Sequence, residues 1–313
     1  MQDDKFEFSL GPPDSGFSLF LSSRCKKIHF IRHAEGHHNV ATSTNGTNEC
    51  LTNMAMVDGG LQLPSEHELY DARLTQKGIN QAKTLREHLK SRPSQGRSFT
   101  HFDLVVVSPL TRTLETARHI FHRGRLPGQP PFLVTKCTKV DVMSGQEFEL
   151  PPPKILVREE CRERWGHYVC DGRRTITDIY PEFPDFDFSE IEHDEDVYYT
   201  EQRESDEHCC ARAQGFLEWL NRRPEKCIAV VTHSSFLRHL FCQFGETLGQ
   251  EDKQSLQRLA GNCELRSIVM CSHGTKEQHD IDSKMNDYDH NVHKRAPSTV
   301  IMRSSSSSAL SEE

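Results

Sequence analysis

The stretch Lys27-Ile-His-Phe-Ile-Arg-His-Ala-Glu-Gly-His-His-Asn39 predicts the first strand of a sheet and a polar site at its end. Its opening residues, Lys27 to Ile31, form a short apolar run of the length of a buried strand. Arg32 and His33 follow directly, where that strand ends. Because ligands of an open parallel sheet bind beyond the carboxyl ends of the strands, we expect Arg32 and His33 to face a ligand.

Two further apolar runs end in polar residues in the same way. Phe102-Asp-Leu-Val-Val-Val107 leads into Ser108-Pro-Leu-Thr-Arg112, and Lys226-Cys-Ile-Ala-Val-Val-Thr232 leads into His233 and Ser234. The apolar spacing predicts helices over residues 75–89, 109–122, 205–221 and 234–245, with Thr75 and Ser108 as caps, and further strands over 132–135 and 264–270. Strands that alternate with amphipathic helices indicate an α/β fold, here a three-layer α/β/α sandwich around a mostly parallel sheet.

The composition divides the 313 residues into three parts. A hydrophobic fraction of 35% lies below the globular average, so part of the chain is expected outside the core. We predict a flexible N-terminal arm over 1–25, a folded domain over 26–273, and a disordered, serine-rich acidic tail over 274–313. Within the domain, residues 41–70 and 140–205 are expected as inserted segments that cap the site.

The charge and hydropathy of the chain exclude several classes of partner. A net charge of −8 argues against binding to nucleic acid or to an anionic membrane, because phosphate binding without sequence preference needs a surplus of Lys and Arg. No stretch approaches the ~20 apolar residues of a membrane-spanning helix, and the acidic start lacks the basic residues of a secretory signal. The predicted location is the cytoplasm, with the nucleus as a second option.

The cysteines and the acidic residues are distributed unevenly. Eleven cysteines without a Cys-x-x-Cys pair indicate reduced thiols, and the scattered Cys161, His167 and Cys170, with residues 208–210, lack the ligand spacing of a zinc site. Between Glu182 and Glu207, twelve Asp and Glu residues stand against a single Arg. If that segment forms part of a cap, it is expected to repel highly anionic substrates.

Three strand ends thus bring two arginines and two histidines to one rim of the sheet: Arg32, His33, Arg112 and His233. A guanidinium is a permanently charged planar fork that matches phosphate oxygens, and helix N-termini after Ser108 and His233 add N–H donors. Neighbouring cations also oppose protonation of an imidazole, which favours a nucleophilic ring nitrogen. The set predicts a phosphoryl-binding site in which one histidine attacks phosphorus.

Several ordered motifs resemble the histidine phosphatase (phosphoglycerate mutase-like) superfamily, and its eukaryotic phosphoglycerate mutase-like branch most closely. Arg32-His33-Ala34 corresponds to the Arg-His-Gly signature of that family. The other matching blocks are Gly36-His-His-Asn-Val40, residues 71–82, Ser108-Pro-Leu-Thr-Arg-Thr-Leu-Glu-Thr-Ala117, Cys161-Arg-Glu-Arg-Trp-Gly166, Cys170-Asp-Gly-Arg-Arg174 and Val230-Val-Thr-His-Ser-Ser-Phe-Leu237. The resemblance covers roughly residues 26–271.

The resemblance implies roles for the residues of the rim. His33 is implied to be the nucleophile that becomes phosphohistidine, and Arg32, Arg112 and His233 are implied to complete the phosphate pocket. Asn39 and the backbone around Ser234 are implied supporting contacts.

The family also uses a glutamate that protonates the leaving oxygen and later activates water, a few residues before a glycine in the middle of the chain. Glu163, three residues before Gly166, fits this position best. Glu159 and Glu160 remain alternatives.

These features predict a phosphomonoester hydrolase that acts through a phosphohistidine on a small phosphorylated metabolite or a phosphoprotein, with no metal and no cofactor. The nearer alternative is a mutase, but mutases of this superfamily carry a Trp-Asn and Gly-Trp pattern soon after the nucleophile, and residues 39–70 contain no Trp. A catalytically silent binding module is a second alternative, although the four rim residues are all present. A metallohydrolase is suggested by the 18 histidines, yet no ligand pair supports it. The sequence identifies neither the substrate nor the oligomeric state.

Overall fold

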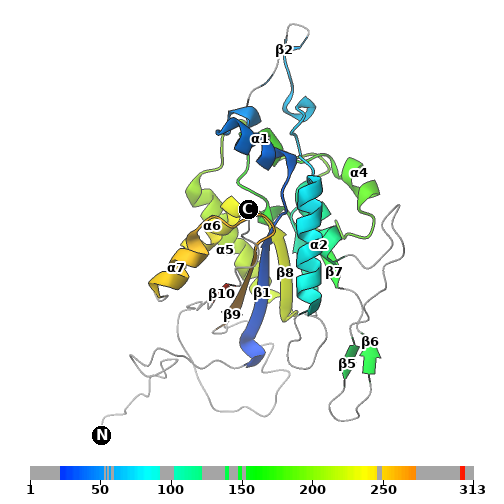
Figure 1. Cartoon of the computed structure of the whole chain (residues 1–313), viewed down its shortest axis with the longest axis vertical. Helices are drawn as coiled ribbons and strands as arrows, with labels where there is room; N and C mark the ends of the chain where they lie inside the picture. Colours follow the sequence, from blue (N-terminus) through cyan, green and yellow to red (C-terminus); the bar gives the residue numbers. More distant parts are fainter. Residues whose placement is uncertain are drawn as a thin grey trace.

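The structure is a computed structural model that describes residues 22–52, 54, 56–57, 60–91, 102–121, 138–140, 147–149, 153–244, 249–272 and 304–306. Its centre is a six-stranded sheet with the strand order β10-β9-β1-β8-β4-β7 (Figure 1). The strands are β1 (Cys25–Arg32), β4 (Leu104–Val107), β7 (Lys154–Val157), β8 (Cys227–Thr232), β9 (Leu265–Cys271) and β10 (Ser304–Ser306). Neighbours among β1, β8, β4 and β7 run parallel, whereas β9 and β10 are antiparallel additions beside β1. The sheet is therefore mostly parallel, as predicted.

Helices cover both faces of this sheet. The described helices are α1 (His37–Asn45), α2 (Gln76–Ser91), α3 (Thr111–Phe121), α4 (Ile176–Ile179), α5 (Asp206–Arg222), α6 (Ser234–Cys242) and α7 (Gln250–Gln257). Helices α2 and α3 pack on one face, and α5, α6 and α7 pack on the other (Figure 1). This arrangement confirms the three-layer α/β/α sandwich.

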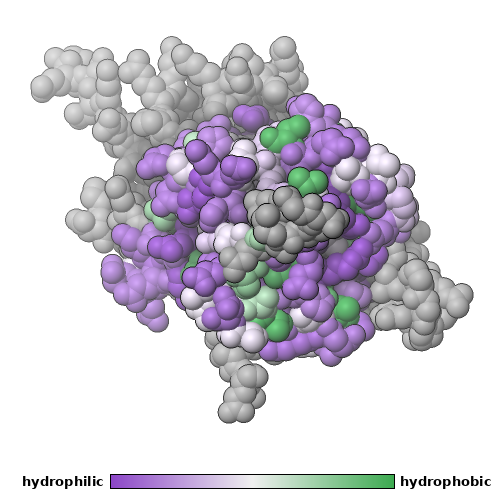
Figure 2. Space-filling view, turned by 90° about the horizontal axis from the view of Figure 1, so that it is seen from above, coloured by the Kyte–Doolittle hydropathy of each residue, from purple (hydrophilic) through white to green (hydrophobic). Residues whose placement is uncertain are grey.

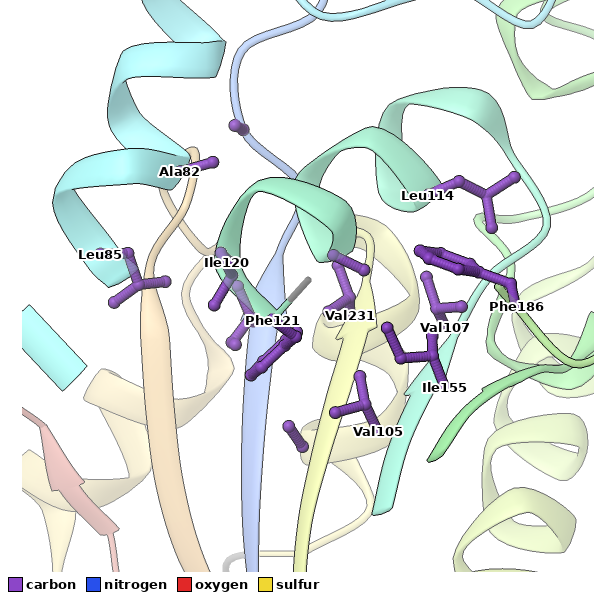
Figure 3. Packing of buried hydrophobic residues seen from close by; sticks show 14 of the residues in the cluster. Ala82, Leu85, Val105, Val107, Leu114, Ile120, Phe121, Ile155, Phe186 and Val231 are labelled. Atoms are coloured by element: carbon purple, nitrogen blue, oxygen red, sulfur yellow. The ribbon is translucent and has the colours of Figure 1, made fainter. Parts of the chain in front are cut away.

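The alternation of side chains along β4 shows how the layers are joined. Val105 and Val107 face α2 and α3, whereas Leu104 and Val106 face α5 and α6. Figure 3 shows Val105 and Val107 beside Phe121 and Leu114 of α3. All four β4 residues are buried, which is expected of a parallel strand covered by helices on both sides.

Several short elements complete the chain. Two small hairpins consist of β2 (Met56–Val57) with β3 (Gly60–Leu61), and β5 (Thr138–Val140) with β6 (Glu147–Glu149). Single 3-10 turns occur at Ser22–Arg24, Glu49–Leu51, Pro64–Glu66, Glu159–Cys161, Val169–Asp171 and Tyr180–Glu182. The segment between α1 and α2 lies above the carboxyl ends of the parallel strands (Figure 1). Leu51 and Leu69 of this segment share a small apolar cluster with Val169, which belongs to the other inserted segment. The two inserted segments therefore support each other as a cap.

Some element boundaries differ from the prediction. The expected strand over 132–135 lies outside the described residues, and the parallel neighbour of β4 is instead β7, whose three apolar residues were too short a run to be recognised. Residues 41–70, expected as an inserted segment, contain the second half of α1 and the β2–β3 hairpin, neither of which was predicted. The helix expected over 109–122 begins only at Thr111, and α7 was not predicted.

The two ends of the chain also differ in part. Cys25, assigned to the flexible arm, is the first residue of β1, where it continues the antiparallel pairing with β9. Ser304–Ser306 of the predicted disordered tail form β10 against β9. Among the described residues, no helix is both long and apolar enough to cross a membrane.

Candidate active site

The carboxyl ends of β1, β8 and β4 lie next to one another and bring the predicted residues together. Parallel register places Arg32 beside Thr232, and Val107 beside Val231, so His33, His233 and Ser108 follow at the same rim. Figure 2 shows this end of the molecule, where hydrophilic residues dominate the described surface. The polar chemistry expected of the rim therefore comes from strands that are far apart in sequence.

His33 is held as a neutral base with one nitrogen available. Its Nδ1 lies 2.7 Å from the carbonyl oxygen of Ala34, and because a carbonyl only accepts, Nδ1 carries the proton and Nε2 keeps its lone pair. The side chain is 2% exposed. Burial, followed by the charges of Arg112 and Arg32, holds the pKa of His33 well below 6.5. The ring can therefore act as a nucleophile through Nε2 at neutral pH.

The second histidine is adjacent. The rings of His33 and His233 have centroids 5.2 Å apart, and Nε2 of His233 lies 2.8 Å from Oγ of Ser108. The prediction that Ser108 caps a helix is wrong, because α3 begins at Thr111 and its first N–H donates to Oδ1 of Asp71 at 2.7 Å. Since Pro109 and Leu110 separate Ser108 from the helix, its hydroxyl is directed to His233 instead.

Both arginines are anchored by the protein. Nη2 of Arg112 donates to Oδ1 of Asp171 at 2.8 Å, and its Nη1 donates to the carbonyl of Cys170. Nη1 of Arg32 donates to the carbonyl of Ala260 at 2.8 Å. Arg112 is only 1% exposed, so these contacts fix the direction of a buried guanidinium. Asp171 is the anchor of Arg112.

The three candidate glutamates have different surroundings. Glu163 accepts hydrogen bonds from the backbone N–H groups of Phe236 at 2.9 Å and Ser235 at 3.1 Å, in the first turn of α6, and its charge acts on Arg32. Glu159 forms ion pairs with Arg162 and Arg173 at 3.0 and 2.9 Å. Glu160 forms an ion pair with Arg158. Glu163 is thus the candidate whose carboxylate accepts from the first turn of α6, the helix that follows His233, and among the described residues it forms no ion pair with an arginine.

Asn39 and the backbone around Ser234, the two predicted supporting contacts, can each offer only part of their hydrogen-bonding groups to a ligand. Oδ1 of Asn39 accepts from the backbone N–H of Gly36 at 3.0 Å and from Nδ2 of Asn262 at 3.2 Å, which leaves its amide nitrogen for a ligand. Ser234 opens α6. The next two N–H groups of that helix already donate to Glu163, so the backbone around Ser234 offers fewer donors than predicted.

A third histidine of the site was not recognised from the sequence. His38 on α1 is 7% exposed, and its ring centroid lies 5.3 Å from that of His33. Its pKa lies well below 6.5, because of burial and then the charges of Arg112 and Arg32. Gly36 is the available sequence signal, since a Cβ there would lie 2.8 Å from the His38 ring.

The acidic segment from Glu182 to Glu207 should repel anions less strongly than its composition suggests. Its carboxylates form ion pairs with basic residues on other elements: Glu182 with Arg73 and Arg174, Asp187 with Lys154, Glu190 with Arg158, Asp196 with Arg162, and Glu204 with Arg212. These pairs neutralise much of the local charge. Repulsion of highly anionic substrates is therefore expected to be weaker than the composition alone suggests.

The candidate metal ligands do not assemble. In the part of the chain that the structure describes, no group of three or more His, Cys, Asp and Glu side chains is arranged to hold a metal ion. Cys161 instead lies in the apolar core that α5 and α6 form with the sheet.

The buried histidines predict that acidification lowers the free energy of unfolding. His33, His38 and His233 all have pKa values below 6.5, mainly because of burial, so below that pH the unfolded chain binds protons that the folded chain does not. Stability is therefore fully present above about pH 7 and falls towards pH 5, by up to about 1.4 kcal/mol per pH unit for each histidine. Denaturant unfolding at pH 7.5 and 5.5 measures this, and His38→Gln is expected to shrink the difference. Equal stability at both values would contradict the prediction.

The chain is similar to proteins of a known family. The model of the histidine phosphatase superfamily (branch 1) matches residues 66–129 and 150–280. The chain is 35% identical over 265 residues to a phosphoglycerate mutase-like protein of Arabidopsis thaliana, covering 83% of this chain and 90% of that protein. Phosphoglycerate mutase-like protein 1 of the same plant is 34% identical over 278 residues, covering 88% and 90%. The crystal structure of the α-ribazole phosphatase from Shigella flexneri aligns with a TM-score of 0.41 at 17% identity, over 77% of this chain and 89% of that one. The protein belongs to the histidine phosphatase superfamily.

Proposed function

We propose that this protein hydrolyses phosphomonoesters through a phosphohistidine on His33, without a metal or a cofactor. The observation that carries the proposal is the convergence of His33, with Nε2 available, on two anchored arginines and a second buried histidine. Two guanidinium groups match the charge of a phosphate dianion. The neutral imidazole provides the nucleophile that such a substrate requires.

The residues supply each step of the reaction. Nε2 of His33 attacks phosphorus, the bond from phosphorus to the leaving oxygen breaks, and Glu163 gives its proton to that oxygen. Glu163 then takes a proton from water, whose oxygen attacks the phosphohistidine. The Nε2–P bond breaks, orthophosphate leaves, and His33 regains its lone pair. Arg32, Arg112 and His233 hold the charge on the phosphoryl oxygens in both steps.

Buried nitrogens of the site support the assignment of a phosphoryl group. Nε of Arg32, Nε of Arg112, Nδ1 of His38 and Nδ1 of His233 are buried and have no hydrogen-bond partner in the described structure. A buried polar atom without a partner costs about 1–3 kcal/mol. The oxygens of a phosphoryl group can accept from such donors, which would recover part of that cost on binding.

Phosphoryl transfer to a second hydroxyl is the other candidate, because two similar Arabidopsis proteins carry the name phosphoglycerate mutase-like. Both reactions pass through the same phosphohistidine and differ in the acceptor. The absence of Trp from residues 39–70 favours water as the acceptor here. Phosphorus NMR of a phosphoglycerate reaction separates them, since hydrolysis yields orthophosphate and transfer yields an isomer.

The direct test is a phosphomonoester assay on the full chain. We expect release of orthophosphate from at least one of p-nitrophenyl phosphate, a sugar phosphate or a phosphoserine peptide, and an acid-labile phosphoenzyme trapped from labelled substrate. We expect EDTA to leave the rate unchanged. Activity lost with EDTA and restored by zinc would overturn the metal-free mechanism, and turnover without a phosphoenzyme would overturn the intermediate.

Ser108 is expected to set the tautomer of His233. Nε2 of His233 lies 2.8 Å from Oγ of Ser108, and we assign the hydroxyl as the donor of this hydrogen bond, which puts the ring proton on Nδ1, where it can donate to a phosphoryl oxygen. Ser108→Ala should lower kcat by roughly 10- to 100-fold with a small change in KM, and Ser108→Thr should recover part of the loss. Nitrogen NMR of the ring reports the tautomer directly. An unchanged tautomer in Ser108→Ala would refute this role.

His38 is expected to bind the phosphoryl group as a neutral donor. His38→Phe keeps the packing but removes the donor, so KM and the dissociation constant of orthovanadate should each rise about tenfold, the effect of one hydrogen bond to a charged group. Titration calorimetry with orthovanadate measures the second value. His37→Ala is the matched control, because His37 is exposed one position earlier on α1. Equal binding by the His38→Phe variant and the wild type would exclude the role.

A further inference from the structure

Two thiols lie side by side on neighbouring strands, at the end of the sheet away from the active site. Cys25 is the first residue of β1, and Cys271 is the last residue of β9. The antiparallel register places the two residues directly opposite each other. Their sulfur atoms are 3.0 Å apart. The reaction proposed for the rim uses neither residue.

The register makes this pair suitable for a covalent bond. Directly opposed residues of an antiparallel pair have Cα atoms about 4.5–5.5 Å apart, and a disulfide requires about 4.4–6.8 Å. The sulfur atoms need to approach by only about 1 Å to reach the length of an S–S bond. Rotation of the two side chains can supply this approach while the backbone stays in place.

The two thiols differ in access. Cys25 is half-buried, whereas Cys271 is buried at the end of β9. Burial and the neighbouring Cys25 raise the pKa of Cys271 to about 12. Cys25 is therefore the thiol that an outside reagent reaches first, and Cys271 is placed to react second.

We propose that Cys25 and Cys271 are a modification site that forms a disulfide by exchange with a small-molecule disulfide such as oxidised glutathione. The thiolate of Cys25 attacks one sulfur of oxidised glutathione and releases one glutathione thiolate. The sulfur of Cys271 loses its proton, attacks the sulfur of Cys25, and releases the second glutathione. Two protein thiols are oxidised and one glutathione disulfide is reduced to two thiols, so the electrons balance.

The bond would clamp β9 to β1 at the end of the sheet opposite the rim. Arg32 is the last residue of β1, so the disulfide lies at the other end of that strand. The segment before β9 contributes the carbonyl of Ala260 to Arg32 and the amide of Asn262 to the carbonyl of His33. Clamping β9 therefore protects the backbone that supports the site, and the rim keeps its geometry.

A second pair of thiols provides an internal comparison. Cys210 on α5 and Cys242 at the end of α6 have sulfur atoms 3.9 Å apart. They lie on packed helices and share no strand register. Cys242 is exposed and is expected to react with glutathione, but the longer distance favours a mixed disulfide over a closed bond there.

The test equilibrates the full chain in glutathione buffers of graded potential, alkylates the remaining thiols, and maps tryptic peptides by mass spectrometry. In an oxidising buffer we expect a linked pair of peptides, residues 25–26 joined to 267–276. The disulfide should raise the Tm by roughly 10 °C, because it closes a loop across a separation of 246 residues. Cys25→Ser should abolish the linked peptide and the rise in Tm, whereas Cys242→Ser should keep both.

Each outcome bears on the proposal. A linked peptide that appears in the wild type and disappears in Cys25→Ser supports it. Alkylation of both thiols without prior reduction, even in the most oxidising buffer, overturns it. A bond from Cys25 to another cysteine also overturns it. Phosphatase activity is measured in the same samples. The linked peptide is detected independently of turnover, so the test remains decisive even if the protein shows no phosphatase activity.

Discussion

Replacing His33 with alanine is expected to abolish both turnover of phosphomonoesters and formation of the acid-labile phosphoenzyme. The variant lacks the Nε2 atom to which phosphorus is transferred, so no other group of the rim can complete the first step. We expect a loss of at least about 1,000-fold in kcat/KM, since the anchored arginines can still bind and polarise the substrate. Initial rates and acid-quench trapping with labelled substrate measure the two losses.

The controls for His33 come from the same motif. His37→Ala removes an exposed imidazole four residues later and should keep wild-type rates. Added imidazole should restore part of the hydrolysis in the His33→Ala variant if the small cavity admits it, and the product is then orthophosphate without phosphoenzyme. Full activity of the His33→Ala variant would end the phosphohistidine mechanism.

The second large effect is expected from Glu163→Gln, and it depends on the leaving group. An alkoxide leaves poorly without a proton, so hydrolysis of an alkyl phosphate should slow by about 100- to 1,000-fold. Nitrophenolate leaves without protonation, so p-nitrophenyl phosphate should lose far less in the phosphoryl-transfer step. Gln keeps an oxygen that can accept from Ser235 or Phe236, which preserves the first turn of α6. Single-turnover kinetics with both substrates separate the transfer step from the hydrolysis of the intermediate.

The neighbouring glutamates provide matched comparisons. Glu160→Gln weakens the ion pair with Arg158 and should slow both substrates equally or not at all. Glu159→Gln removes a buried charge that pairs with Arg162 and Arg173, so its main effect should be on stability. If the leaving-group pattern appears in Glu160→Gln and not in Glu163→Gln, the acid has been assigned to the wrong residue.

Much of the fold could be predicted from local patterns of apolar and polar residues in the sequence. The apolar runs that became β1, β4 and β8 are short, contain β-branched residues, and end in polar residues, so both the strands and their rim could be predicted. Once the strands are parallel neighbours, Arg32, His33 and His233 must meet, because equal register brings their carboxyl ends to one edge. Strand β7 was not predicted, because three apolar residues after a run of prolines are too few to show the hydrophobic periodicity of a strand.

The contacts that tune the site could not be predicted in this way. The partner of His233 is Ser108, 125 residues away in sequence, and the backbone groups that hold Glu163 are more than 70 residues away. The burial of His38 depends on how α1 folds back over the end of β1. Local sequence patterns record which side of a strand or helix is apolar. They do not record which distant loop closes over it.

The order of apolar runs and polar strand ends was enough to predict that Arg32, His33, Arg112 and His233 gather at one rim of the sheet, and to favour phosphate as its ligand. The closed fold was needed to show that Asp171 anchors Arg112 and that Ser108 contacts His233. It was also needed to show that several carboxylates of the acidic segment pair with basic residues on other elements. The physical reason is the range of the interactions. Strand and helix formation depend on neighbours along the chain, whereas hydrogen bonds and ion pairs depend on which side chains the closed fold brings within about 3 Å.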